Sequence, residues 1–140
     1  MKDEEGFTLA ELLMVLAILS LVIVTVWPNL ARTDRSDMAL AQGKILAALR
    51  KAQAKAIGQN RDTSVEIDVA GRSVNADPLP KSVSLRVTFG GDSASQNRSL
   101  FKFFPDGTST GGEVELRTPN ETRLITINWL TGNAAPVNPQ

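Results

Sequence analysis

A single carboxylate, Glu11, lies within an otherwise uncharged apolar segment near the start of the chain. The segment runs from Phe7 to Trp27 and contains no lysine or arginine that could neutralise it. An ionisable group in such a segment indicates a function and needs a partner. Cleavage after Gly6 would supply one, because it leaves an α-ammonium on Phe7 that a neighbouring copy could bring to Glu11. The alternative is a carboxylate that lies at headgroup depth and simply contacts water.

Two further pairs of carboxylates stand two residues apart, Glu66 with Asp68 and Glu113 with Glu115. Such pairs can bind calcium or serve acid–base chemistry. The polar face of a half-buried strand also places acids at this spacing, and we favour that interpretation. The chain has no histidine and no cysteine, which excludes sites built on imidazole or thiolate. We therefore predict no catalytic, cofactor-binding or metal-binding residues, and a protein that is not an enzyme.

The apolar segment is long enough to cross a lipid bilayer. Its 21 residues would form a helix about 31 Å long at about 1.5 Å per residue, close to a hydrocarbon core of about 30 Å. Thirteen of them are Leu, Ile, Val or Phe, which together favour insertion by about 4–8 kcal/mol. One carboxylate at the helix centre costs only about 3 kcal/mol on the same scale. We predict a transmembrane helix over residues 7–28.

The sequence from Gly6 onward, GFTLAELLMVLAILSLVIVTVWP, resembles the N-terminal signal of type IV pilins and type II secretion pseudopilins. The resemblance implies that a prepilin peptidase removes residues 1–6 by cutting between Gly6 and Phe7, and that Phe7 is then N-methylated. It also implies that Glu11, the fifth residue of the mature chain, directs assembly. Pro28 stands where these proteins often break the helix. The leader MKDEEG departs from the pattern, because it is acidic where the family usually has a basic leader.

Beyond the membrane segment, residues 29–140 are predicted to form one periplasmic domain that begins with an amphipathic helix at about 36–58. Apolar residues recur there at spacings of three and four, which places them on one helix face. These residues are Met38, Ala41, Ile45, Leu49, Ala52 and Ala56. Gly58 and Asn60 mark the expected end of the helix. The opposite side carries Lys44, Arg50, Lys51 and Lys55, which we interpret as a solvated face rather than a DNA contact.

After the amphipathic helix, the pattern changes to short runs in which apolar residues alternate with polar ones, as is typical of β-strands. The main runs are Ser64–Val69, Ser82–Phe89, Ser99–Phe104, Gly112–Arg117 and Arg123–Leu130. The tail APVNPQ has two prolines and no periodicity, so we expect it to fray and the β region to span about 64–131. Helix first and strands after predict an α+β fold in which a long N-terminal helix packs on an antiparallel sheet, as the pilin resemblance also implies.

The segments FKFFPDGTSTGGEVEL and ITINWLTG are similar to the C-terminal domain of H-type minor pseudopilins and their FimT-type pilin relatives. The resemblance implies a minor pseudopilin of a type II protein secretion system, assembled into the periplasmic pseudopilus that promotes export of folded proteins. It implies a single-pass protein of the bacterial inner membrane with its C-terminal domain in the periplasm. The expected partners are other pseudopilins, prepilin peptidase and the inner-membrane assembly platform.

A FimT-type minor pilin that binds DNA for uptake by a type IV pilus is the alternative. It would need a basic patch late in the chain, but the four cations from Arg98 to Arg123 are balanced by four acids between Asp106 and Glu121. The whole chain has 15 basic and 15 acidic residues, so we do not expect a nucleic-acid partner. A plain membrane-anchored binding domain is the third possibility, and it predicts no cleavage by prepilin peptidase.

Overall fold

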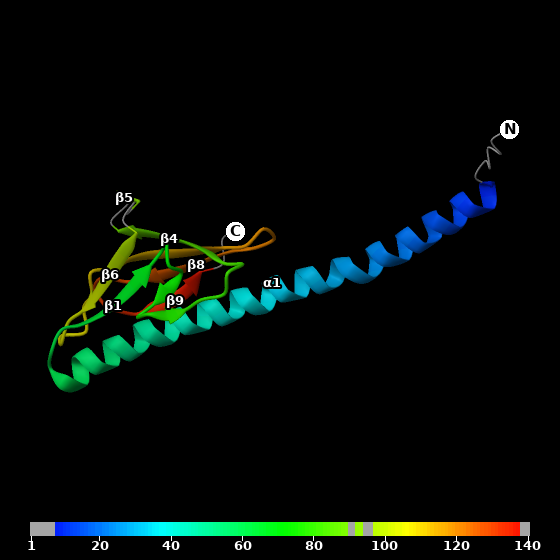
Figure 1. The fold of residues 1–140 in the computed structure, drawn as a ribbon. Helices are drawn as coiled ribbons and strands as arrows, with labels where there is room; N and C mark the ends of the chain where they lie inside the picture. Colours follow the sequence, from blue (N-terminus) through cyan, green and yellow to red (C-terminus); the bar gives the residue numbers. More distant parts are fainter. Residues whose placement is uncertain (1–7, 90–91, 94–96, 138–140) are drawn as a thin grey trace. The chain divides into compact units, whose positions relative to one another are not determined.

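The computed structural model of the chain describes residues 8–89, 92–93 and 97–137, without the side chains of residues 23–34 and 92–93. One long helix, α1 (Leu9–Gln59), precedes all the strands (Figure 1). The strands are β1 (Thr63–Asp68), β2 (Ser73–Val74), β3 (Asp77–Pro78), β4 (Ser84–Phe89), β5 (Asp92–Ser93), β6 (Arg98–Phe103), β7 (Gly112–Arg117), β8 (Thr122–Ile127) and β9 (Ala134–Val137). The chain divides into two compact units, one up to Thr33 and the other from Asp34, and α1 contributes to both.

The helix does not end at Pro28, where the sequence predicts a break. Helical backbone runs without interruption from Leu9 to Gln59, so the two predicted helices are one. Proline has a backbone φ close to that of a helix, and within a helix it removes one hydrogen bond and crowds the preceding turn. A long helix can continue through a proline, which is a common site of kinks. The rule that proline ends a helix is therefore too strong here.

The other end of α1 lies where the sequence predicts it. Asn60 has a φ of 49°, in the left-handed region that asparagine tolerates better than most residues. This conformation lets the N–H of Arg61 donate to the carbonyl of Ala56 at 3.2 Å, and the N–H of Asn60 donate to the carbonyl of Ile57 at 3.4 Å. The carbonyls of the last turn are thereby satisfied, and the chain reverses into β1.

The strands form two antiparallel sheets. One has the order β3-β2-β1-β6 and the other the order β5-β4-β7-β8-β9. In the first sheet, β1 pairs along its whole length with β6, so that Thr63 lies opposite Phe103 and Asp68 opposite Arg98. In the second, β7 is central and pairs with β4 and β8. A helix that precedes antiparallel sheets is the predicted α+β, pilin-like architecture, which is confirmed.

The C-terminal tail corrects one expectation. Instead of fraying from Ala135, the chain forms β9, which pairs with β8 and places Pro136 opposite Ile125; residues 138–140 of the predicted tail lie outside the described residues. Proline has no N–H to donate, so it is tolerated in a sheet mainly on an edge strand. Because β9 is the last strand of its sheet, only one of its sides pairs with another strand. The pairing depends on a distant partner, which local composition does not reveal.

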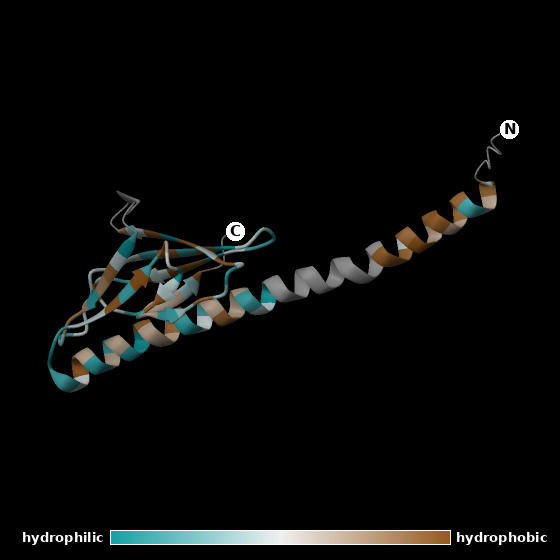
Figure 2. Ribbon diagram, viewed as in Figure 1, coloured by the Kyte–Doolittle hydropathy of each residue, from teal (hydrophilic) through white to brown (hydrophobic). Residues whose placement is uncertain are grey.

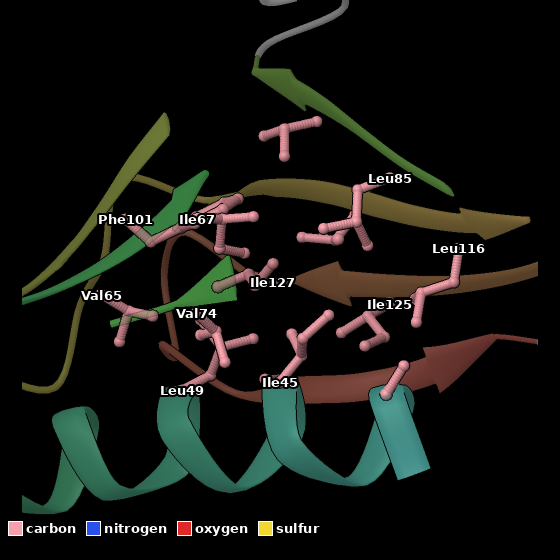
Figure 3. Close-up of a cluster of buried hydrophobic side chains, with 14 of the residues drawn as sticks. Ile45, Leu49, Val65, Ile67, Val74, Leu85, Phe101, Leu116, Ile125 and Ile127 are labelled. Carbon is pink, nitrogen blue, oxygen red and sulfur yellow. The ribbon is translucent and has the colours of Figure 1, made fainter. Parts of the chain in front are cut away.

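The hydrophobic core lies between the second half of α1 and the inner faces of the sheets. The predicted helix stripe from Met38 to Ala56 is buried along its length. Figure 3 shows Ile45 and Leu49 directed from the helix toward side chains of the sheets, including Val74 and Ile127. The strand residues of this core include Val65, Ile67, Val87, Phe101, Phe103, Val114, Leu116 and Ile125. Alternation of inward apolar and outward polar residues therefore predicts the core correctly.

Polar side chains hold α1 to the sheets along the margins of this core. The Ser82 hydroxyl donates to the Asp37 carboxylate at 2.6 Å, and the Arg123 guanidinium donates to the Gln42 side-chain carbonyl at 2.6 Å. The Thr63 hydroxyl donates to the backbone carbonyl of Ala52 at 2.6 Å. These bonds supply direction that apolar contact lacks, and so they fix which face of the helix meets the sheets.

We expect Leu49→Ala to lower the free energy of unfolding of the second unit by about 2–5 kcal/mol, because it leaves a cavity at a fully buried position. Leu40→Ala is the matched control, since Leu40 lies on the same helix but is 52% exposed, and we expect a change within about 0.5 kcal/mol. Urea titration of the full chain in detergent micelles measures both. Equal losses for the two variants would contradict this packing.

Candidate assembly site at the start of the helix

The start of α1 is fixed by Thr8, a residue whose role the sequence reasoning missed. The backbone N–H of Glu11 donates to the Thr8 hydroxyl at 3.3 Å and to the Thr8 carbonyl at 3.0 Å. Thr8 is thus the N-cap of the helix, and Glu11 is the third residue of its first turn. The spacing Thr-x-x-Glu is the sequence signature of a capping box, so the pattern was readable in advance. Gly6 and Phe7 lie outside the described residues.

Glu11 is exposed to solvent in the isolated chain. Its position in the first turn is favourable for a carboxylate, because the N-terminal end of a helix carries partial positive charge. Among residues 8–89, 92–93 and 97–137, no ion pair includes Glu11. The cap therefore sets the position of the carboxylate in the first turn, and both its oxygens stay accessible to a group from another chain.

The helical residues that follow Glu11 are almost all hydrophobic, as the colours of the ribbon in Figure 2 show. Ten large apolar side chains between Leu9 and Val22 are each 49–79% exposed. The one hydroxyl among the described side chains of this stretch, that of Ser20, donates to the Leu16 carbonyl at 2.8 Å and so needs no water. A helix that is hydrophobic all round is normally buried against protein or lipid. We therefore expect protein or lipid to cover this surface.

Within the described residues, no helix is both long enough and apolar enough to cross a membrane.

The two other acid pairs lie on strand faces and have basic partners. Arg98 approaches both Glu66 and Asp68, each at 3.4 Å. Glu115 pairs with Arg117 at 2.7 Å. Within the described part of the chain, no cluster of three or more acidic, cysteine or histidine residues could hold a metal ion. The arrangement agrees with the polar face of a half-buried strand.

The turn between β6 and β7 is held by Asp106. Its carboxylate accepts the Thr108 hydroxyl at 2.7 Å and the Thr108 backbone N–H at 2.9 Å. Both bonds lower the pKa of Asp106 below its ordinary value, and the bond from the Thr108 hydroxyl has the larger effect. Gly107 follows with a φ of 88°, which favours glycine. The carboxylate therefore closes a turn.

The fold and the start of the chain together define the pilin class of proteins. Residues 1–27 match the model of the prokaryotic N-terminal methylation motif. Residues 41–132 match the model of the family described as type II transport protein GspH, and the chain belongs to that family. A curated relative, "Type II secretion system protein H" of Xanthomonas campestris pv. campestris, is 29% identical over 134 residues, which cover 91% of this chain and 79% of the relative.

Solved structures agree with this fold. Two crystal structures of the type IV minor pilin FimU of Pseudomonas aeruginosa align with TM-scores of 0.54 and 0.52 at 15% and 16% identity. The alignments cover 76% and 71% of this chain, and 92% and 91% of the FimU chains. At such low identity the likeness concerns the fold alone. The GspH family is a family of structural proteins and not of enzymes, and with the methylation motif it implies a membrane-anchored periplasmic protein that joins other pseudopilins.

We expect Thr8→Val to weaken the first turn of α1 by about 1 kcal/mol, because the N–H of Glu11 loses its side-chain acceptor. Amide hydrogen exchange at Glu11 and Leu12 should become roughly fivefold faster. Thr8→Ser keeps the hydroxyl and should exchange like the unmodified chain. Unchanged exchange in Thr8→Val would show that the cap does not hold this turn.

Asp106→Asn should destabilise the second unit in a pH-dependent way. The pKa of Asp106 is lowered on folding, so its contribution is complete above the unfolded value of about 3.9 and is lost as the pH falls through the lower folded value. The difference in urea midpoint between the two chains should therefore be largest near neutral pH and shrink in acid. A difference that is constant with pH would contradict the charged hydrogen bond.

Proposed function

We propose that this chain is a minor pseudopilin of a type II protein secretion system that enters the periplasmic pseudopilus through its N-terminal helix. Prepilin peptidase cuts between Gly6 and Phe7, and the new N-terminus is methylated. Residues 7–28 cross the inner membrane once, and the domain from residue 29 lies in the periplasm. The observation that supports this most strongly is one accessible carboxylate, Glu11, on a helix surface that is apolar all round.

The assembly chemistry follows from the energetics of a charge in an apolar environment. Taking the Glu11 carboxylate out of water costs several kcal/mol unless a cation compensates it. Cleavage before Phe7 supplies that cation, and a methylated amine keeps its positive charge. The ammonium of one subunit then pairs with Glu11 of a neighbour, while apolar side chains such as Leu12 and Leu16 pack between the helices. The ion pair sets the axial register, and apolar packing supplies most of the association energy.

The spanning role of this segment rests on its sequence: 21 residues from Phe7 to Trp27 with one charge. A subunit waiting in the membrane keeps the same apolar surface against lipid that it later places against other subunits. The inner-membrane assembly platform is the partner that would move it from one environment to the other. Export of folded proteins is then a property of the filament, to which this chain contributes a subunit.

The alternative, a FimT-type minor pilin that binds DNA, needs a basic patch late in the periplasmic domain. The arginines late in the described chain have acidic neighbours instead: Arg98 approaches Glu66 and Asp68, and Arg123 pairs with Glu121 at 2.7 Å. Phosphate binding would compete with these ion pairs. The charge arrangement thus favours the secretion role over DNA uptake.

Glu11→Gln should leave cleavage intact but reduce incorporation with other pseudopilins at least tenfold, because the neighbour's ammonium would have no counter-ion. A tenfold reduction corresponds to about 1.4 kcal/mol of association free energy. Glu4→Gln is the matched control, since the same chemical change falls in the leader that is removed before assembly. Chemical cross-linking in cells, followed by quantification of the cross-linked pseudopilin complexes, measures incorporation. Normal incorporation of Glu11→Gln would refute the proposed pairing.

A gel-shift titration of the full chain in detergent with duplex DNA separates the two functions. For a secretion subunit we expect no shift at about 0.15 M salt at micromolar protein. Binding at moderate salt that is lost steeply as salt rises would instead support DNA uptake, since counter-ion release governs phosphate contacts.

A further inference from the structure

A groove of about 590 Å³ opens between α1 and the edge of the first sheet. One wall is the outer side of α1 between Lys44 and Lys55, and the other is made by the start of β1 and the β2–β3 hairpin. Between the lysines, the helix presents only alanine methyl groups, those of Ala47, Ala48 and Ala52. The small side chains leave the strand edge accessible from the helix side. A volume of this size is typical of ligand-binding clefts.

Among the described strands, none pairs with the first residues of β1 on the groove side. β6 pairs with β1 from Thr63 to Asp68, but β2 reaches only Ile67 and Asp68. In an antiparallel ladder, the backbone groups of successive residues alternate between the two sides of a strand. The Glu66 N–H donates to the Asn75 side-chain carbonyl at 2.9 Å, and the Glu66 carbonyl accepts from the Asn75 N–H at 2.8 Å. Ser64 lies two residues earlier, so its own N–H and carbonyl point to the same side. That side is the groove.

The register of β6 supports the same direction. Lys102, which lies opposite Ser64, bonds with Thr110 through both backbone groups, its carbonyl at 3.0 Å and its N–H at 3.2 Å. Those groups of Lys102 therefore do not engage Ser64. Asn75 and Ala76 take positive φ values of 48° and 66°, which turns the chain away after β2. The hairpin thus stops short and leaves one donor and one acceptor of Ser64 at the open edge.

The groove also carries positive charge. Lys44, at one end of the groove, forms a salt bridge with Asp77 at 2.9 Å. Among the ion pairs of the described residues, none involves Lys51 or Lys55, which lie four apart on the exposed side of α1. Like charges at this spacing repel each other and weaken the helix slightly. A carboxylate bound between them would relieve this repulsion.

We propose that this groove binds an extended acidic segment of a partner protein, which adds as a short strand at Ser64 and places carboxylates against Lys51 and Lys55. Strand addition supplies affinity through the backbone, and side chains at alternate positions supply specificity. A nucleic acid fits less well, because it cannot complete a strand edge. The proposal is independent of Glu11 and of filament assembly.

The test uses the full chain in detergent and a fluorescent synthetic peptide of about eight residues in which glutamate alternates with valine. We expect saturable binding by fluorescence anisotropy, weakened at least tenfold by the double change Lys51→Glu and Lys55→Glu. Lys81→Glu is the matched control, since Lys81 is exposed and lies outside the groove. A lysine–valine peptide of the same length should not bind.

The strand edge is tested separately from the charge. Ser64→Pro removes an N–H that the β6 ladder does not use, so it should abolish peptide binding, whereas Ser64→Ala should bind normally. A peptide N-methylated at every residue has no backbone N–H on either edge. It should therefore fail to bind the unmodified chain, and it covers the case that Ser64→Pro does not fold. In NMR spectra of the unmodified chain, the backbone amide of Ser64 should show the largest chemical-shift change on peptide binding.

Three results would overturn the proposal: no saturation of the unmodified chain by the glutamate–valine peptide, equal binding by the chain with both lysines reversed, or equal binding of the N-methylated peptide. Binding of duplex DNA that is lost on reversing Lys51 and Lys55 would assign the groove to nucleic acid instead. Because the readout is peptide binding, failure here leaves the proposed assembly through Glu11 untouched, and a failure of assembly leaves this groove untouched.

Discussion

One electrostatic constraint governs the start of the helix: between Leu9 and Val22, Glu11 is the one charged residue on an apolar surface. Thr8 caps the helix and so places Glu11 in the first turn, and the apolar side chains from Leu9 to Val22 surround it. An arrangement of this kind is costly in isolation and becomes favourable when a cation arrives together with apolar cover. The cation that this chain can generate is its own new amino terminus. Under the proposed assembly, the leader, the cleavage point and the helix surface are parts of a single mechanism.

In the second unit, the same helix packs against a folded β domain. The stripe from Met38 to Ala56 is buried by both sheets, and polar bonds such as Ser82 to Asp37 fix the helix face that they meet. The helix is thus a shared element, with an exposed apolar end and an amphipathic end. Family membership agrees with this division, since the N-terminal motif and the GspH model match separate parts of the chain.

Much of this could be predicted from the sequence, because the deciding interactions are local or periodic. The three- and four-residue spacing of the helix stripe and the alternation around Val65 and Phe101 identify the core. Two features could not be predicted, since each depends on distant partners: β9 forms because β8 offers an edge, and the groove exists because β2 ends after Val74. Pro28 stays within the helix although the local rule for proline predicts a break. The Thr8 cap was readable from its spacing and was overlooked. Cleavage and methylation rest on Gly6 and Phe7, outside the described residues.

The claim that proteolysis creates the counter-ion for Glu11 is tested most directly by mass spectrometry of the native chain extracted from membranes. The account predicts a mass that starts at Phe7 and carries one added methyl group. An intact chain that still starts at Met1 would contradict it, because no ammonium would then stand at the start of the helix.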